Sequence, residues 1–206
     1  MRRRKRKNSE HYFTAHPKSK PKYGIIRTNL RGRPFEFLTS SGVFSKRRVD
    51  LGTRLLVESM ILPDEGCVLD VGCGYGAVGV TAAASNPNLH VFMVDVNTRA
   101  IWLAGQNVKL NDVHNAEVRH GYLYDPVTAL SFSGILSNPP VSAGMETVET
   151  IIVEAPKHMA GKALFQMVVK SKIGGKRLRI TLEEAFGNVE ILARKSGYRV
   201  FVSERQ

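Results

Sequence analysis

The sequence has few cysteines, no zinc-binding pattern and no long apolar run. Its 206 residues include only two cysteines, Cys67 and Cys73, too few for the disulfide framework of a small secreted domain. The six histidines are scattered, so no metal site is expected. No apolar run approaches the roughly 20 residues that cross a membrane, and none follows the basic first residues as in a secretory signal. These absences predict a soluble, cytoplasmic protein with neither a metal nor a membrane as partner.

Acidic residues are scarce relative to basic ones. The chain carries 30 Lys and Arg against 18 Asp and Glu, which gives a net charge of +12 and a pI near 10.0. Basic residues fill positions 2–7 and recur as far as Arg48. A field of this sign attracts polyanions. Residues 1–22 are therefore predicted to form a flexible arm that neutralises nucleic-acid phosphates; the alternative is a solvated tail that only improves solubility.

Beyond the arm, residues 23–206 are predicted to form a single α/β domain, because strand and helix patterns alternate. Short strands and turns are expected over 23–49, where glycine recurs. The other predicted strands are Cys67–Val71, Leu89–Val94, Glu117–Arg119, Gly134–Ser137, Ala163–Val169, Val189–Ala193 and Tyr198–Ser203, the last two as an antiparallel hairpin. Helices are predicted from Leu51 to before Pro63, after the glycine-rich turn through Ala84, after an N-cap at Thr98, and over Val148–His158 and Gly175–Phe186.

A glycine-rich turn follows the first of these apolar strands. Gly72, Gly74 and Gly76 let the backbone pass close to a ligand at the carboxyl edge of the sheet. Gly74, Gly76 and Gly79 also spell the G-x-G-x-x-G pattern of dinucleotide sites, which is a weak signal alone. Asp70 favours another ligand, because a carboxylate opposes a pyrophosphate but suits an ammonium group such as that of methionine. Asp70, Gly72 and Gly74 are therefore predicted to bind S-adenosylmethionine.

The next strand ends in a second acidic residue. Asp95 can accept hydrogen bonds from both hydroxyls of a ribose, and Val96 follows it at the same edge. Nucleotide cofactors of several kinds share this contact, so it supports adenosine binding without selecting the cofactor. The alternative is an acid that only favours the start of the following helix.

Asn138 and two prolines end a third strand. Pro139 and Pro140 restrict the backbone and remove N–H donors, which leaves rigidly aimed carbonyl acceptors beside the side-chain oxygen of Asn138. Two acceptors on one NH₂ group can hold a planar amine toward a methyl donor and stabilise the charge that develops. Asn138 and Pro139 are the predicted catalytic residues, and Asn138 is also a predicted cofactor contact. As an exposed amide, Asn138 is expected to contribute little to the core; the alternative is a plain loop.

The glycine-rich segment from Asp70, the acid Asp95 and the Asn138-Pro-Pro segment together resemble class I methyltransferases that modify amino groups of bases or glutamine. A closer resemblance, to the small-domain ribosomal RNA guanine-N2 methyltransferases and most of all to archaeal single-domain members, rests on four segments: Ser41-Gly-Val-Phe-Ser, Asp50-Leu-Gly-Thr, Asn138-Pro-Pro-Val-Ser-Ala-Gly and Phe186-Gly-Asn-Val-Glu. It extends over about His11–Ser203. The resemblance implies a Rossmann-like, seven-stranded mixed sheet with helices on both faces, S-adenosylmethionine as cofactor and RNA as substrate.

Two positions depart from the family. Tyr122 stands where a carboxylate usually accepts from the adenine amine, so Tyr122, a backbone group or Asp125 is expected to replace that contact. Val141 stands where an aromatic residue often stacks on the target base, so Phe44 or Tyr122 is expected to supply the stacking, unless these rings pack in the core. Phe44, Pro140 and Val141 are the predicted substrate contacts.

Three functions remain open from the sequence. The favoured one is methyl transfer to an exocyclic amino nitrogen of an RNA base, with guanine N2 of ribosomal RNA before adenine N6. A protein glutamine-N5 methyltransferase could use the same motif, although a glutamine substrate does not call for a basic arm. A non-catalytic RNA-binding module with a methyltransferase fold is the third, and the intact Asp70, Asp95 and Asn138 oppose it. The oligomeric state is not predicted.

Overall fold

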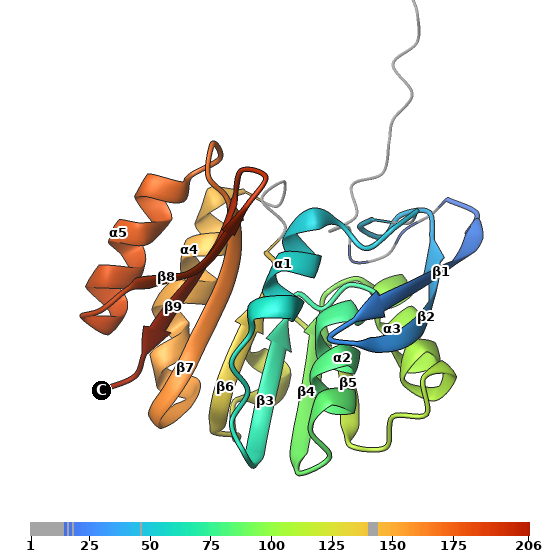
Figure 1. Ribbon diagram of the computed structural model, residues 1–206, viewed down its shortest axis with the longest axis horizontal. Helices are drawn as coiled ribbons and strands as arrows, with labels where there is room; N and C mark the ends of the chain where they lie inside the picture. Colours follow the sequence, from blue (N-terminus) through green and yellow to red (C-terminus); the bar gives the residue numbers. More distant parts are fainter. Residues whose placement is uncertain (1–14, 16, 18, 46, 140–143) are drawn as a thin grey trace, which may run out of the picture.

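The computed structural model describes residues 15, 17, 19–45, 47–139 and 144–206. They form a seven-stranded mixed sheet with helices on both faces, as predicted, and a two-stranded sheet beside it (Figure 1). In chain order the elements are β1 (Tyr23–Leu30), β2 (Arg33–Ser40), α1 (Leu51–Ser59), β3 (Gly66–Val71), α2 (Ala77–Ser85), β4 (Leu89–Asp95), α3 (Thr98–Leu110), β5 (Ala116–His120), the 3-10 helix η1 (Asp125–Val127), β6 (Phe132–Ser137), α4 (Met145–Glu154), the 3-10 helix η3 (Ala155–His158), β7 (Met159–Lys170), α5 (Gly175–Phe186), β8 (Glu190–Lys195) and β9 (Tyr198–Glu204).

The order of the strands locates the ligand-binding edge of the main sheet. The order is β5-β4-β3-β6-β7-β9-β8, with β3, β4, β5, β6 and β7 parallel to one another and β9 antiparallel to both β7 and β8. The chain therefore builds outward from β3 to β5 and then returns to place β6 on the other side of β3. In open α/β sheets, ligands bind beyond the carboxyl ends of the strands at such a reversal. The predicted motifs follow β3, β4 and β6 at that edge.

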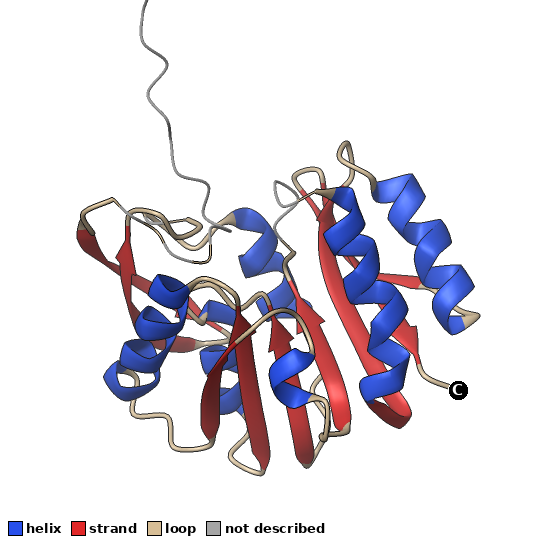
Figure 2. Cartoon of the chain, turned by 180° about the vertical axis from the view of Figure 1, so that it is seen from behind, coloured by secondary structure: helices blue, strands red, loops and turns tan. Residues whose placement is uncertain are grey.

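Alternate residues of each strand face opposite layers of helices. Val68 in β3 packs in the same cluster as residues of α1, α2 and α3, whereas Leu69 and Val71 pack with residues of α4 and α5. Figure 1 shows α1 and α2 in front of the sheet, and Figure 2, drawn from behind, shows α4 in front. Because both faces of β3 are covered, apolar residues occupy successive positions, as at Val68 and Leu69, and not only alternate ones.

The predicted N-cap of α3 is wrong by one residue. Asn97, not Thr98, caps the helix, because its side chain accepts hydrogen bonds from the backbone N–H groups of Arg99 and Ala100. Thr98 is the first helical residue. The amide nitrogen of Asn97 also donates to the carbonyl oxygen of Gly42, at 3.0 Å. The cap therefore connects α3 to the loop that follows β2.

The helix predicted over Val148–His158 is displaced in the structure. It begins earlier, at Met145 after Gly144, and α4 ends at Glu154, where the shorter turn η3 takes over. Pro156 accounts for this end, because proline has no N–H to donate and its ring crowds the preceding turn. In the part of the chain that the structure describes, no helix has both the length and the apolar character needed to cross a bilayer.

Two asparagine side chains attach the β1–β2 hairpin to α3. Asn107 accepts from the backbone N–H of Leu38 at 2.6 Å and donates to its carbonyl oxygen at 3.0 Å. Asn111 repeats this pairing with the backbone of Glu36, at 3.0 and 2.7 Å. The two side-chain amides thus pair the backbone N–H and carbonyl groups of Glu36 and Leu38 at the free edge of β2, as a neighbouring strand would. This attachment holds the loop after β2, which carries Phe44, beside the carboxyl edge of the main sheet.

The end of the predicted arm contacts the domain. The carbonyl oxygen of Ala15 accepts a hydrogen bond from the backbone N–H of Thr98 at 3.0 Å. The Arg99 guanidinium donates to the carbonyl oxygens of Ser19 and Pro17, at 2.6 and 3.3 Å. The domain boundary at residue 22 and the role of the arm stay predictions, and residues 1–14 lie outside the described part.

Candidate active site

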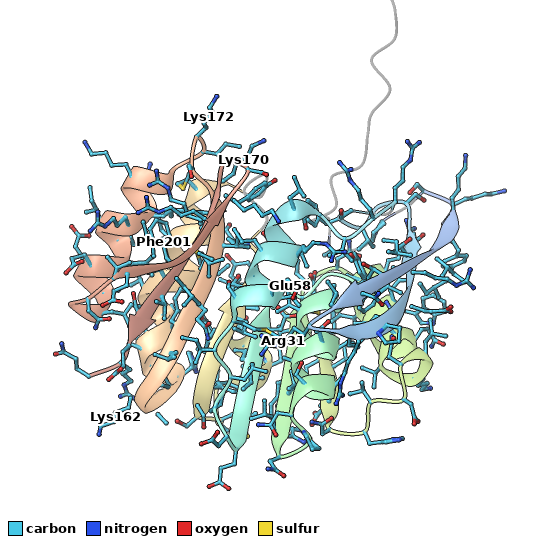
Figure 3. The ribbon with its side chains drawn as sticks, in the orientation of Figure 1. Arg31, Glu58, Lys162, Lys170, Lys172 and Phe201 are labelled. Atoms are coloured by element: carbon cyan, nitrogen blue, oxygen red, sulfur yellow. The ribbon has the colours of Figure 1, made fainter. Side chains whose placement is uncertain are left out.

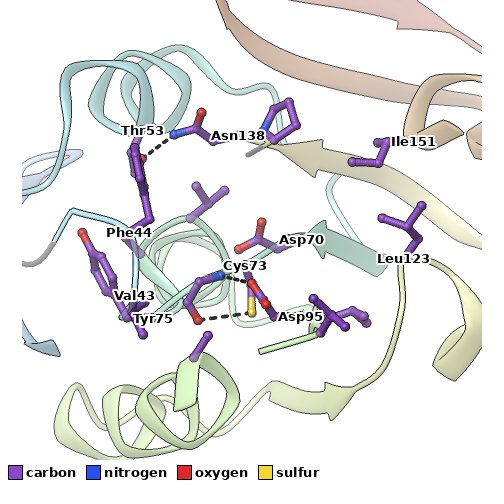
Figure 4. Close-up of a pocket in the computed structure, with 18 of the residues that line it drawn as sticks. Val43, Phe44, Thr53, Asp70, Cys73, Tyr75, Asp95, Leu123, Asn138 and Ile151 are labelled. Carbon is purple, nitrogen blue, oxygen red and sulfur yellow. Dashed lines mark hydrogen bonds between the residues drawn. The ribbon is translucent and has the colours of Figure 1, made fainter. Parts of the chain in front are cut away.

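A cavity of about 260 Å³ lies at the carboxyl edge of β3, β4 and β6 (Figure 4). Its lining includes every predicted site residue that the structure describes: Phe44, Asp70, Gly72, Gly74, Asp95, Val96, Tyr122, Asn138 and Pro139. The predicted substrate contacts Pro140 and Val141 lie outside the described residues. The structure thus brings three separate motifs to one cavity, while the role of each residue in binding or catalysis stays a prediction.

The turn between β3 and α2 encloses a buried carboxylate. Gly72 and Gly76 have φ values of 73° and 90°, a left-handed conformation that residues with a Cβ rarely adopt. The Asp70 side chain lies under this turn with 1% of its surface exposed. Its Oδ2 accepts from the backbone N–H of Gly79 at 2.9 Å, and its Oδ1 accepts no hydrogen bond from the described residues.

The charge of Asp70 is only partly compensated. Burial, reinforced by the nearby charge of Asp95 and opposed by the hydrogen bond from Gly79, raises the pKa of Asp70 to about 7. A cation in the cavity would relieve this penalty by favouring the ionised form. An ammonium group beside Asp70 is therefore the ligand chemistry that this carboxylate fits.

Asp95 faces the same cavity from the end of β4. Its Oδ2 accepts from the backbone N–H of Gly74 at 2.9 Å, and its Oδ1 accepts from that of Asn97 at 2.8 Å. Burial raises its pKa above the ordinary value, although these backbone hydrogen bonds act in the opposite direction. A carboxylate has about four acceptor sites, so Asp95 keeps the capacity to accept from a ligand hydroxyl group beside these backbone donors. Asp95 also fixes the turn that follows Asp70.

Asn138 lies across the cavity from Asp95, and its amide is held by residues before and within α1 (Figure 4). Its Nδ2 donates to Thr53 Oγ1 at 2.8 Å and to Asp50 Oδ2 at 3.3 Å. A carboxylate can only accept, so the NH₂ group and not the oxygen of the amide faces Asp50. The side-chain oxygen of Asn138 accepts no hydrogen bond from the described residues and is available to a ligand.

Asp50 organises this contact. It is the N-cap of α1, accepting from the backbone N–H groups of Gly52 and Thr53, and it also accepts from the Thr53 hydroxyl. Because that hydroxyl donates its only hydrogen to Asp50, its oxygen is left to accept from Asn138. Asp50 and Thr53 were not predicted as site residues, although an aspartate directly before a predicted helix signals an N-cap.

The expectation that Asn138 contributes little to the core is therefore wrong. Its side chain is half-buried and connects β6 to α1, through partners 88 and 85 residues earlier in the chain. The strand-end position gave no sign of these contacts, because they join distant segments. Removing the amide would leave Asp50 and Thr53 short of a donor, which carries a cost in stability as well as in the site.

Two aromatic residues line the cavity without being buried. Phe44 is 37% exposed and Tyr122 is 48% exposed, so neither ring packs in the core. Both are placed where a ring could stack on a flat ligand. Asp125, expected as a possible replacement for the missing adenine contact, does not line the cavity. Tyr122 and the apolar Leu123 lie there instead.

Cys73 also lines the cavity but is a poor nucleophile. Burial, with the charges of Asp95 and Asp70, raises the pKa of its thiol well above the ordinary value. The thiolate, which is the reactive form, is therefore disfavoured. Among the described residues, no group of three or more His, Cys, Asp or Glu side chains is arranged to hold a metal ion.

Comparison with known sequences gives a consistent family. Residues 34–202 match the model of the methyltransferase small domain. The chain is 36% identical to the Bacillus subtilis protein YbxB, over 96% of this chain and 99% of that one. It is 32% identical to ribosomal RNA small subunit methyltransferase C of Aeromonas hydrophila, over 81% of this chain and 48% of that protein. The chain thus spans about half the length of that methyltransferase.

A solved structure has the same fold. The Thermus thermophilus 16S rRNA N2 G1207 methyltransferase, in complex with AdoMet and guanosine, superposes with a TM-score of 0.81. The superposition covers 92% of this chain and 52% of that one, at 23% sequence identity. A match of this extent shows that nearly the whole chain shares this fold.

Proposed function

Because this chain belongs to the methyltransferase small domain family, we propose that it transfers a methyl group from S-adenosylmethionine to an exocyclic amine of a ribosomal RNA base. Guanine N2 is the first choice of target. Support comes from the Aeromonas hydrophila relative, which is named a ribosomal RNA small subunit methyltransferase, and from the Thermus thermophilus enzyme, whose structure contains AdoMet and guanosine.

The buried carboxylates support the choice of cofactor. S-adenosylmethionine, when bound, supplies a methyl group on a sulfonium sulfur together with an ammonium group and an adenosine. Asp70, whose pKa of about 7 reflects an uncompensated buried charge, is assigned to the ammonium group. Asp95 is assigned to the ribose hydroxyls, and Val96 and Tyr122 to the adenine. Gly72 and Gly74 keep the intervening backbone free of side chains.

The orientation of the Asn138 amide carries the proposal for the reaction. Because Asp50 and Thr53 occupy its NH₂ group, Asn138 presents an acceptor oxygen to the cavity. An acceptor there can hold the N–H of a planar amine, together with the backbone carbonyl of Pro139. As the amine attacks, positive charge develops on its nitrogen, and these acceptors stabilise it. The proton leaves after transfer, so the site needs no strong base.

The test is transfer of tritium from labelled S-adenosylmethionine to deproteinised small-subunit ribosomal RNA and, separately, to total ribosomal protein. We expect label in the RNA, recovered after nucleoside digestion as N2-methylguanosine. Recovery as N6-methyladenosine would keep the amine mechanism and change the base. Label confined to protein glutamine would replace the proposal with the amide-methylating alternative, and a chain that binds RNA without transfer would be the non-catalytic one.

A further inference from the structure

A group of unpaired cations lies at the same sheet edge as the cavity, on the side of β7 and β9. Lys170 ends β7 and pairs in register with Tyr198 of β9, which in turn pairs with Lys195 of β8. The backbone N–H of Ser171 donates to the carbonyl oxygen of Gly197 at 2.8 Å, so the β7–α5 loop and the β8–β9 turn meet. The register therefore gathers the exposed side chains of Lys170 and Lys195 at one edge. Figure 3 shows Lys170 and Lys172 together there, with Lys162 at the opposite edge.

This group adjoins the residues that orient Asn138. The ring of Tyr198 lies against α1, since a Cβ added at Gly52 would be 2.9 Å from its Cε1 atom. Gly52 donates to Asp50. Burial, together with the charge of Asp50, raises the pKa of Tyr198. Two exposed arginines, Arg47 and Arg48, lie two and three residues before this N-cap. We call five exposed cations the basic ledge, namely these two arginines and the lysines at and after the ends of β7 and β8: Arg47, Arg48, Lys170, Lys172 and Lys195.

The side chains of the basic ledge lie at the edge of the cavity without carboxylate partners. Three exposed cations farther from the cavity do pair with glutamates: Arg27 with Glu36, Lys157 with Glu154 and Arg177 with Glu149. No cation of the ledge makes an ion pair with any residue that the structure describes. Like charges held together without anions repel one another, so this arrangement favours an anionic ligand.

Carboxylates around the sheet do not neutralise the ledge. Asp70 and Asp95 at the same edge are buried or half-buried in the cavity. Asp125 and Glu146 are exposed near this edge, after β5 and at the start of α4, and neither pairs with a ledge cation. At the opposite edge, a pair of exposed acids precedes β3: Asp64 and Glu65. The ledge cations therefore face solvent, without a carboxylate partner among the described residues, at the edge that carries the cavity.

We propose that the basic ledge binds successive backbone phosphates of the RNA strand whose base enters the cavity. This inference rests on the proposed function, because it takes RNA to be the substrate. Lysine and arginine bind phosphate oxygens without reading sequence, so the ledge would set the position of the strand and not the identity of the base. Phe44 and Asn138 would then act on a base delivered from that side.

The test compares two variants with the same net charge. Lys170→Gln/Lys172→Gln removes two ledge charges, and the control Lys162→Glu removes the same charge at the opposite edge. Binding of a fluorescein-labelled RNA hairpin is followed by anisotropy over a salt series. For the ledge variant we expect the slope of log K against log salt to fall by about one for each lysine that contacts a phosphate. The control should keep the wild-type slope.

Methyl transfer separates this inference from the proposed function. We expect the ledge variant to raise the KM for ribosomal RNA, while kcat at saturating RNA and calorimetric affinity for S-adenosylmethionine stay at wild-type values. A wild-type salt slope and KM in the ledge variant would overturn the ledge and leave the function intact. Equal losses in both variants would show a general charge effect and also overturn it. Absence of transfer to RNA by the wild-type chain would overturn the proposed function itself.

Discussion

The two walls of the cavity are built differently. On the β3–β4 wall, carboxylates are held mainly by backbone N–H groups nearby in sequence, as Asp70 is by Gly79 and Asp95 by Asn97. On the β6 wall, Asn138 is held by the side chains of Asp50 and Thr53, from a distant segment. A backbone N–H donor is kept when its residue is replaced by any residue except proline, whereas a side-chain donor or acceptor is lost when its residue is replaced. The β3–β4 wall, to which the cofactor is assigned, should therefore tolerate substitutions around its carboxylates. The β6 wall, to which the substrate amine is assigned, should depend on Asn138, Asp50 and Thr53 individually.

The largest effect should come from Asn138→Ala, which removes the side-chain acceptor oxygen from the β6 wall. Loss of one preorganised hydrogen-bonding group in a dry site costs on the order of 10²–10³ in turnover. Calorimetry should show cofactor affinity unchanged, because that ligand is assigned to the other wall. Thermal unfolding should show a modest loss, of about 1–3 kcal/mol, because Asp50 and Thr53 lose a donor. A wild-type rate with normal cofactor binding would make Asn138 structural.

The second effect concerns the opposite wall. Asp70→Asn keeps the shape of the side chain and removes its charge, so cofactor binding should weaken by about 1–3 kcal/mol while any remaining bound fraction turns over normally. The wild-type affinity should rise from pH 6 to pH 8, because Asp70 has a pKa of about 7 and must ionise to meet the ammonium group. Calorimetry over this range checks both. If the cofactor affinity of Asp70→Asn changed with pH as much as that of the wild type, the assignment of Asp70 to the ammonium group would be contradicted.

The same carboxyl predicts the pH dependence of stability. The pKa of Asp70 rises from 3.8 to about 7 on folding, so between these values the folded chain holds a proton that the unfolded chain has lost. Its contribution to the free energy of unfolding is therefore largest below about pH 4, falls as the pH rises through about 7, and is constant above that. Urea unfolding of wild type and Asp70→Asn should converge at low pH and separate toward neutral pH.

A smaller effect should follow from weakening the network behind Asn138. Thr53→Val removes the hydroxyl that accepts from Asn138, leaving Asp50 as the remaining partner. Loss of one such hydrogen bond, worth about 1 kcal/mol, should lower kcat roughly five-fold without changing the KM for cofactor. Thr53→Ser restores the hydroxyl and should restore kcat. If valine and serine lower kcat equally, packing and not the hydrogen bond explains the effect.

The smallest effect should come from the arm. Deleting residues 1–8 should lower the salt slope of RNA binding by about 0.7–0.9 for each phosphate that the shortened chain no longer neutralises, and leave cofactor affinity unchanged. Combining the deletion with the ledge variant tests whether the two basic regions bind RNA separately, since the effects of independent sites add. An unchanged slope in the deletion would make the arm a solubility tail.

The features that could be predicted from the sequence are local ones. Helix α5 was predicted at its observed bounds, Gly175–Phe186, because its apolar spacing lies within one segment. Apolar spacing alone does not locate the end of α4, because the spacing continues past Glu154 whereas Pro156 ends the regular helix. The N-cap of α3 was misplaced by one residue because Thr98 and Asn97 are both good capping residues and only the backbone conformation distinguishes them.

By itself, the sequence determined that strands and helices alternate and that acids, glycines and Asn138 follow particular strands. Parallel strands end at a common edge, so these facts were sufficient to gather the motifs there. Only the tertiary structure decided which way the Asn138 amide points, because its orientation depends on Asp50 and Thr53 across the fold. Only the strand pairing of β7, β8 and β9 decided that scattered lysines form the basic ledge. The physical reason is the same in both cases: charge and hydrogen bonding act through space, and spacing along the chain does not record which segments meet.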